Sequence, residues 1–211
     1  PWHDATAGIG KAVDVVGRDL AVLQDAGVDG VMFCNEADLP YQLKVGPEIV
    51  AAMASIVGQL RRDVRVPFGV NLLWDAIASL AVARATGATF VREVMTGVYE
   101  SDLGMIEPSI GEIAGFRAAI GASDVLLFDN IQPEFASAIG RRSVADRARG
   151  AAFLGVDAIL EAREPCLLEP NRLQRCKGLV EPRERRATPE CERPTERRSS
   201  GDGVDREIVA A

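Results

Sequence analysis

Leu23-Gln-Asp-Ala-Gly27-Val-Asp-Gly-Val31-Met-Phe33 is the stretch that decides the fold, because the chain repeats its pattern twice more. The repeats read Ala83-Arg-Ala-Thr-Gly87-Ala-Thr-Phe-Val91 and Ala152-Phe-Leu-Gly155-Val-Asp-Ala-Ile159. Each begins as the end of an amphipathic helix, and its glycine suits the left-handed residue that closes a helix. The apolar run that follows is typical of a buried parallel strand. The pattern therefore predicts repeated helix–strand units.

Two further strands and the helices between them extend this pattern. The predicted helices cover 11–25, 47–62, 75–86, 109–120 and 143–154, and the predicted strands cover 31–34, 66–71, 90–94, 125–129 and 156–160. Regular alternation of this kind indicates an α/β fold with a parallel sheet. A barrel is favoured over an open sheet, since no Gly-x-Gly-x-x-Gly turn follows any strand. The expected fold is a (β/α)8 TIM-type barrel, present here as about five βα units.

The pattern stops after Leu160. The remaining residues, 161–211, are rich in Arg, Glu and Pro until about Ser200, and five of the chain's 11 prolines lie there. Mixed charge, proline and few large apolar residues predict disorder. Because the break falls at the end of a strand, a change of reading frame also explains it. The expected organisation is a partial barrel domain at 1–160 and a tail at 161–211.

Composition excludes several classes of function. The net charge of −7 argues against a nucleic-acid partner. No apolar run is long enough to cross a bilayer, and no secretory signal opens the sequence, so a cytoplasmic location is expected. The chain has one histidine and four cysteines without a Cys-x-x-Cys pair, which argues against a zinc site or a Ser-His-Asp triad.

Polar residues follow the predicted strands, where parallel barrels carry their active sites. The candidate catalytic residues are Glu36, Glu93 and Asp102, and the candidate ligand-binding residues are Asn35, Asp38, Asn71, Asp75, Arg92 and Asn130. The carboxylates could hold a divalent cation such as Mg²⁺, or act as a general acid and base. Arg92 could pair with a carboxylate or bind a phosphate.

Simpler structural roles compete with these assignments. Asp75 stands where an N-cap residue would precede a helix. Arg92 and Glu93 point to opposite sides of their strand, so one faces the barrel interior and the other contacts a helix. Trp74 suits packing as well as ligand binding, and Cys34 suits a small buried position.

Three of these segments also carry a family resemblance. Gly27–Pro40, Gly69–Asp75 and Phe90–Gly104 together resemble the BtpA family, which includes a factor for photosystem I biogenesis and the SgcQ-like proteins. The resemblance runs from about Lys11 to Leu160. It implies a cytoplasmic (β/α)8 barrel that helps to assemble or stabilise photosystem I in photosynthetic members, attached peripherally to the thylakoid membrane. It implies no known reaction.

The sequence departs from that family at both ends. On the resemblance, a further strand is expected before Pro1 and two further units after Leu160, where the sequence has the charged tail. Two hypotheses follow. One is an assembly factor that acts through a protein partner of a photosystem or another membrane complex. The other is a barrel enzyme acting on a sugar-like or phosphorylated small molecule. A homo-oligomer fits either hypothesis.

Overall fold

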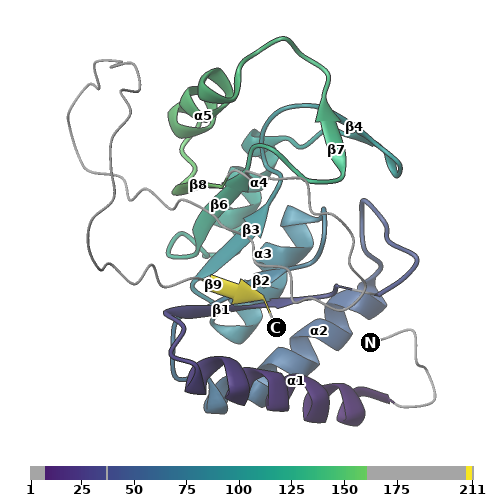
Figure 1. The fold of residues 1–211 in the computed structure, drawn as a ribbon, viewed down its shortest axis with the longest axis vertical. Coiled ribbons are helices and arrows are strands. Elements are labelled where there is room, and N and C mark those ends of the chain that lie inside the picture. Colours follow the sequence, from purple (N-terminus) through teal and green to yellow (C-terminus); the bar gives the residue numbers. More distant parts are fainter. Residues whose placement is uncertain (1–7, 37, 161–207, 211) are drawn as a thin grey trace, which may run out of the picture.

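A parallel β-sheet forms the centre of the molecule (Figure 1). The computed structural model describes residues 8–36, 38–160 and 208–210. The strands lie in the order β8-β6-β3-β2-β1-β9. Their bounds are Gly30–Cys34 for β1, Phe68–Asn71 for β2, Phe90–Glu93 for β3, Leu126–Asn130 for β6, Ala158–Leu160 for β8 and Ile208–Ala210 for β9. The α/β class and the five predicted parallel strands are confirmed, with slightly different ends.

Helices cover one face of this sheet. They are α1 (Gly8–Asp25), α2 (Pro47–Leu60), the short 3₁₀ helix η1 (Arg61–Asp63), α3 (Ala76–Thr86), α4 (Ile110–Ala119) and α5 (Val144–Phe153). The main core joins the first four α-helices to alternate strand residues. Its members include Leu20, Val57, Leu80 and Ile113 from the helices and Val31, Phe33, Val70, Val91 and Leu127 from the strands. Since strand side chains alternate between faces, these strand residues all point to the helical side.

The opposite face of the sheet is also apolar near its middle. Met32, Phe90, Phe128 and Ala158 form a separate buried cluster there. The rings of Phe90 and Phe128 stack, with centroids 4.7 Å apart and an angle of 13° between planes. A sheet with apolar residues on both faces is typical of parallel α/β folds.

Local sequence signals set the ends of the helices as expected. Gly27, Gly87 and Gly155 have φ values of 80°, 82° and 93°, which confirms the left-handed conformation at the end of each repeated helix. Pro47 begins α2, where its missing N–H costs no hydrogen bond.

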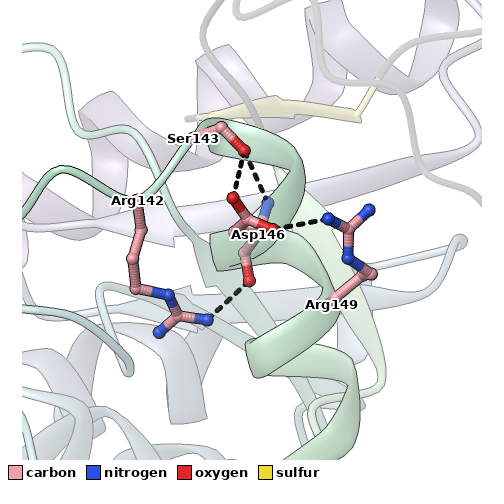
Figure 2. Close-up of polar contacts among 4 residues, drawn as sticks. All are labelled: Arg142, Ser143, Asp146 and Arg149. Atoms are coloured by element: carbon pink, nitrogen blue, oxygen red, sulfur yellow. Dashed lines mark hydrogen bonds and ion pairs between the residues drawn. The ribbon is translucent and has the colours of Figure 1, made fainter.

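Several side chains form hydrogen bonds and an ion pair at the N-terminus of α5. Ser143 Oγ accepts a hydrogen bond from the N–H of Asp146 over 3.1 Å and donates to Asp146 Oδ2 over 2.6 Å. Figure 2 shows Arg149 pairing with the same carboxylate while Arg142 donates to the Asp146 carbonyl. Ser143 first, and then Arg149, hold the pKa of Asp146 below its ordinary value. Ser143 is therefore the N-cap of α5.

A second, antiparallel sheet was not predicted. It consists of β4 (Tyr99–Ser101), β5 (Gly104–Ile106) and β7 (Ala136–Ala138), in the order β5-β4-β7. Figure 1 shows β4 and β7 at the upper right, beyond the parallel strands. The sequence predicted loops here because each strand has only three residues, too few for a recognisable pattern. β5 pairs with β4 in the same loop, whereas β7 comes from the next βα loop, and pairing with that distant segment leaves little local pattern in the sequence.

The strand β9 lies in the segment that the sequence assigns to the tail. Its residue Ile208 pairs with Gly30, so β9 runs parallel to β1 along the edge opposite β2. Residues 161–207 lie outside the described residues, and their expected disorder stays a prediction. Among the helices that the structure describes, none combines the length and apolar character needed to cross a bilayer.

Candidate functional site

The candidate residues lie where neighbouring parallel strands end. Cys34 pairs with Asn71 in the β1–β2 register, and Glu93 pairs with Asp129 in the β3–β6 register. Asn130 ends β6. The parallel pairing therefore brings polar side chains from four strands to one edge of the sheet, as the sequence predicted.

Glu93 is the centre of a buried hydrogen-bond network. Its Oε1 accepts hydrogen bonds from Asn71 Nδ2 over 2.6 Å and from Ser79 Oγ over 3.2 Å. Its Oε2 accepts from the Trp74 N–H over 3.1 Å. Asn71 extends the network, because its Oδ1 accepts from Cys34 Sγ over 3.0 Å. Glu93 thus joins β1, β2, α3 and the loop between β2 and α3.

That loop, residues 72–75, is held by side chains from three elements. Its first two N–H groups donate to Ser79 Oγ and Asn35 Oδ1, each over 2.8 Å, and its third donates to Glu93. The third residue, Trp74, has a φ of 67°. A bulky residue in this left-handed region is unusual and persists only where its surroundings fix it. The polar residues at this edge are therefore largely engaged in shaping the loop.

Burial is the main cause of the raised pKa values of two carboxyl groups, those of Glu93 and Asp129. Glu93 is 4% exposed, and burial raises its pKa from 4.5 to about 8. The hydrogen bond from Ser79 favours the charged form but does not offset this burial. Asp129 is 0% exposed, and burial raises its pKa from 3.8 to about 6. Burial likewise raises the pKa of the Cys34 thiol, which makes a nucleophilic thiolate unfavourable there.

The raised pKa of Glu93 predicts that the fold loses stability as pH rises. Between its ordinary value of 4.5 and about 8, the folded state keeps a proton that the unfolded chain releases. The folded state then binds more protons, so the free energy of unfolding falls with increasing pH, by on the order of 3 kcal/mol. Urea denaturation at several pH values between about 6, the pKa of Asp129, and 8 should show the decline that belongs to Glu93.

The variant Glu93→Gln is the control for this pH dependence, because an amide cannot titrate. Its free energy of unfolding should change much less between the same pH values. An equal slope in the variant and the parent chain would contradict the assignment to Glu93.

Arg92 faces the other side of β3, as the alternation of strand residues predicted. Its Nη2 lies 3.9 Å from Glu134 Oε1, and both side chains are about one fifth exposed, at 21% and 22%. Nearby in sequence, Asn130 Oδ1 accepts a hydrogen bond from the Gln132 N–H over 3.2 Å. Gln132 Oε1 is buried, and no hydrogen-bond partner for it occurs in the part of the chain that the structure describes. This unpaired acceptor was not recognised from the sequence.

The other candidates occupy different positions. Asp75 caps α3 by accepting from the Ala78 N–H over 2.9 Å, and it also accepts from the Val45 N–H over 3.1 Å. Its role as a helix cap is confirmed. Asp38 is half-buried and Glu36 is exposed just after β1. Asp102 lies on the exposed turn between β4 and β5, away from the ends of the parallel strands.

Sequence reasoning missed Ser79. Its hydroxyl is 0% exposed on the buried face of α3 and contacts both Glu93 and the loop before the helix. A polar residue among apolar ones on one helix face was the available signal. No group of three or more His, Cys, Asp and Glu residues that could hold a metal ion occurs among residues 8–36 and 38–160.

Comparisons with known proteins extend over the same part of the chain. The sequence model of the BtpA family matches residues 2–160. The chain is 48% identical over 153 residues to the sgc region protein SgcQ of Escherichia coli K12, which covers 72% of this chain and 57% of that protein. It is 36% identical over 126 residues to the photosystem I biogenesis protein BtpA of Synechocystis, covering 58% of this chain and 44% of the relative.

Similar proteins also occur in other organisms. An uncharacterised protein of Pyrococcus horikoshii is 33% identical over 121 residues, which covers 56% of this chain and 47% of that protein. The chain spans about half the length of the curated relatives it matches. No solved structure matches the chain at a significant level.

Proposed function

The chain belongs to the BtpA family, and on that basis we propose that it serves the biogenesis or stabilisation of a membrane protein complex, photosystem I in a photosynthetic host. The observation that carries the proposal is the family match over residues 2–160, which includes the whole parallel sheet apart from β9. The name of the Synechocystis relative supplies the role. In this role the protein would act at the cytoplasmic surface of the thylakoid membrane and contact an assembly partner.

The proposal includes a closed (β/α)8 barrel for the complete family fold. Strands β1, β2, β3, β6 and β8 pair with their neighbours in chain order. This singly wound order differs from a doubly wound sheet, whose strand order reverses at a switch point. Helices on one face and apolar side chains on the other suit a sheet that curls around its own interior.

Complementation tests the proposed role. The 211-residue chain would be expressed in a Synechocystis strain that lacks its own BtpA, and photosystem I content would be measured by low-temperature fluorescence. We expect a rise in photosystem I relative to the empty-vector strain. Accumulation of the folded chain without any rise would refute the role for this chain.

The second candidate function is the binding of a small molecule. The properties of two side chains, Arg92 and Gln132, favour it. Arg92 is a partly exposed cation at the strand ends, and Gln132 Oε1 is a buried acceptor without a described partner. A sugar-like or phosphorylated ligand would offer an anion to Arg92 and a hydroxyl donor to Gln132. Glu36, Glu93 and Asp102 remain the proposed acid–base residues, and Asn35, Asp38, Asn71, Asp75 and Asn130 the proposed ligand-binding neighbours. Mg²⁺ would accompany a phosphorylated ligand.

Thermal denaturation with added compounds separates the two candidates. Mg²⁺, sugar phosphates and nucleosides would be added to the purified chain and to the Arg92→Ala variant. A ligand at about 100 times its Kd stabilises the folded state by about 2.7 kcal/mol, so binding should raise the Tm of the parent chain and not of the variant. Equal shifts in both proteins, or none in either, would contradict this site.

A further inference from the structure

The small antiparallel sheet exposes several large apolar side chains on one side. We call Val98, Met105, Phe135 and Ile139 the outer apolar face. Their exposed fractions are 44%, 42%, 57% and 57%. Single exposed apolar residues are ordinary on a protein surface, whereas a contiguous group marks an interaction site. The strand register decides which of these cases applies.

The register places these side chains on one face. Tyr99 pairs with Ile106 and Ala138, and these three pack into the buried cluster beneath the sheet. Their neighbours along the strands must then point outward, because side chains alternate. Met105 is opposite Glu100 on that outward side.

The two ends of the face are fixed in the same way. The Ile139 N–H donates to the Val98 carbonyl over 3.2 Å, which continues the β4–β7 pairing by one residue. Phe135 lies two residues before Ser137, the outward partner of Glu100, so it shares that side. All four members of the outer apolar face therefore project from the same side of the sheet, where Val98 and Ile139 are neighbours and Glu100 and Ser137 lie between them and Phe135.

Acidic residues lie within this face and beside it. Glu100, Asp102 and Glu107 are exposed on the same hairpin. The segments 98–107 and 134–139 contain no lysine or arginine. Arg92 pairs with Glu134 at the start of the second segment, and Arg142, three residues after Ile139, donates to the Asp146 carbonyl at the start of α5 (Figure 2). A face that mixes apolar and acidic side chains is complementary to a segment that mixes apolar and basic ones.

We propose that the outer apolar face docks a segment of a partner protein that combines apolar and basic side chains. The inference rests on the proposed biogenesis role, for which it supplies the partner contact. A second copy of this chain fits less well, because a two-fold interface on this face would bring Glu100 and Asp102 of both copies together. Like charges at a desolvated interface oppose association.

Peptide binding tests the docking face directly. The probes are two fluorescein-labelled amphipathic peptides of equal length, one of leucine and lysine and one of leucine and glutamate. Fluorescence anisotropy would measure their binding to the purified 211-residue chain. The leucine–lysine peptide should bind and the leucine–glutamate peptide should not. The double variant Phe135→Ser/Ile139→Ser should weaken binding at least about tenfold, which corresponds to about 1.4 kcal/mol.

Two further variants separate a specific face from general attraction to an acidic protein. Phe153→Ser removes a side chain that is 88% exposed on α5, outside this sheet, and should leave binding unchanged. Glu100→Lys/Asp102→Lys should weaken binding of the leucine–lysine peptide. Circular dichroism would establish that each variant is folded. Equal binding by all variants overturns the proposal, and so does a dimer of the parent chain that Phe135→Ser/Ile139→Ser dissociates in sedimentation velocity.

The complementation strain distinguishes failure of the docking face from failure of the proposed role. If Phe135→Ser/Ile139→Ser loses peptide binding yet restores photosystem I fully, the face is not the partner contact and the inference is overturned. If the unmodified chain binds the peptide through this face but restores nothing, the docking face stands and the biogenesis role does not.

Discussion

Replacing Glu93 by alanine is expected to lower the free energy of unfolding by about 3 kcal/mol, because three buried donors lose their acceptor. These donors are Asn71 Nδ2, Ser79 Oγ and the Trp74 N–H. The loss is smaller than the sum of three unpaired groups, since burying the Glu93 carboxyl is itself unfavourable, as its raised pKa shows. Urea denaturation at neutral pH, followed by tryptophan fluorescence, would measure it.

Two control variants make this prediction specific. Glu93→Gln keeps one carbonyl oxygen at the same place and should be less destabilising than Glu93→Ala. Glu100→Ala removes an exposed glutamate from β4, and its effect should stay within about 0.5 kcal/mol. A change of less than about 1 kcal/mol for Glu93→Ala would show that the loop at 72–75 does not depend on this carboxyl.

Replacing Asp129 by alanine should destabilise the fold by about 2 kcal/mol, for the same physical reason at the next strand. Asp129 Oδ1 accepts from the Met95 N–H over 2.8 Å, and Oδ2 accepts from Thr96 Oγ1 over 2.6 Å. Both donors begin the chain segment that leads from β3 to the antiparallel sheet. Their loss should therefore also loosen that sheet, which hydrogen exchange at β4 and β7 would detect.

Asparagine at the same position should be tolerated far better than alanine. Its carbonyl oxygen can accept from the Met95 N–H, and the hydroxyl of Thr96 can accept from its amide. Asp124→Ala, at an exposed site before β6, serves as the matched surface control. Equal destabilisation by Asp129→Asn and Asp129→Ala would mean that the charge, and not the hydrogen bonds, matters at this position.

The parallel framework was predictable because its signals are local. A glycine after a helix and an apolar run after the glycine recur within a few residues of each other, so Gly27, Gly87 and Gly155 mark three helix–strand junctions without any tertiary information. Helix caps at Asp75 and Ser143 follow from the same short-range chemistry. The strands β4, β5 and β7 carry no such signal and were missed.

The location of the candidate site was predictable from the sequence, whereas the contacts of its individual side chains were not. Polar residues at strand ends were recognised as a group, and the parallel register brings Asn71 and Glu93 together as expected. The contribution of Ser79 was not predicted, and neither was the unpaired oxygen of Gln132. The contacts of both residues depend on the direction of one side chain and on its packing neighbours. The two-residue period of a strand indicates the face on which a side chain lies, but it does not give its contacts.

The sequence by itself determined the order of helices and strands, the edge of the sheet where polar residues gather, and membership of the BtpA family. Only the tertiary structure decided that Glu93 holds a loop and that Phe135 and Ile139 share an exposed face. The physical reason is the range of the interactions. Caps and periodicity act within a few residues, whereas Glu93 bonds to residues 14 and 22 positions away. The outer apolar face likewise depends on the pairing of β4 with β7, two segments more than 30 residues apart in the sequence.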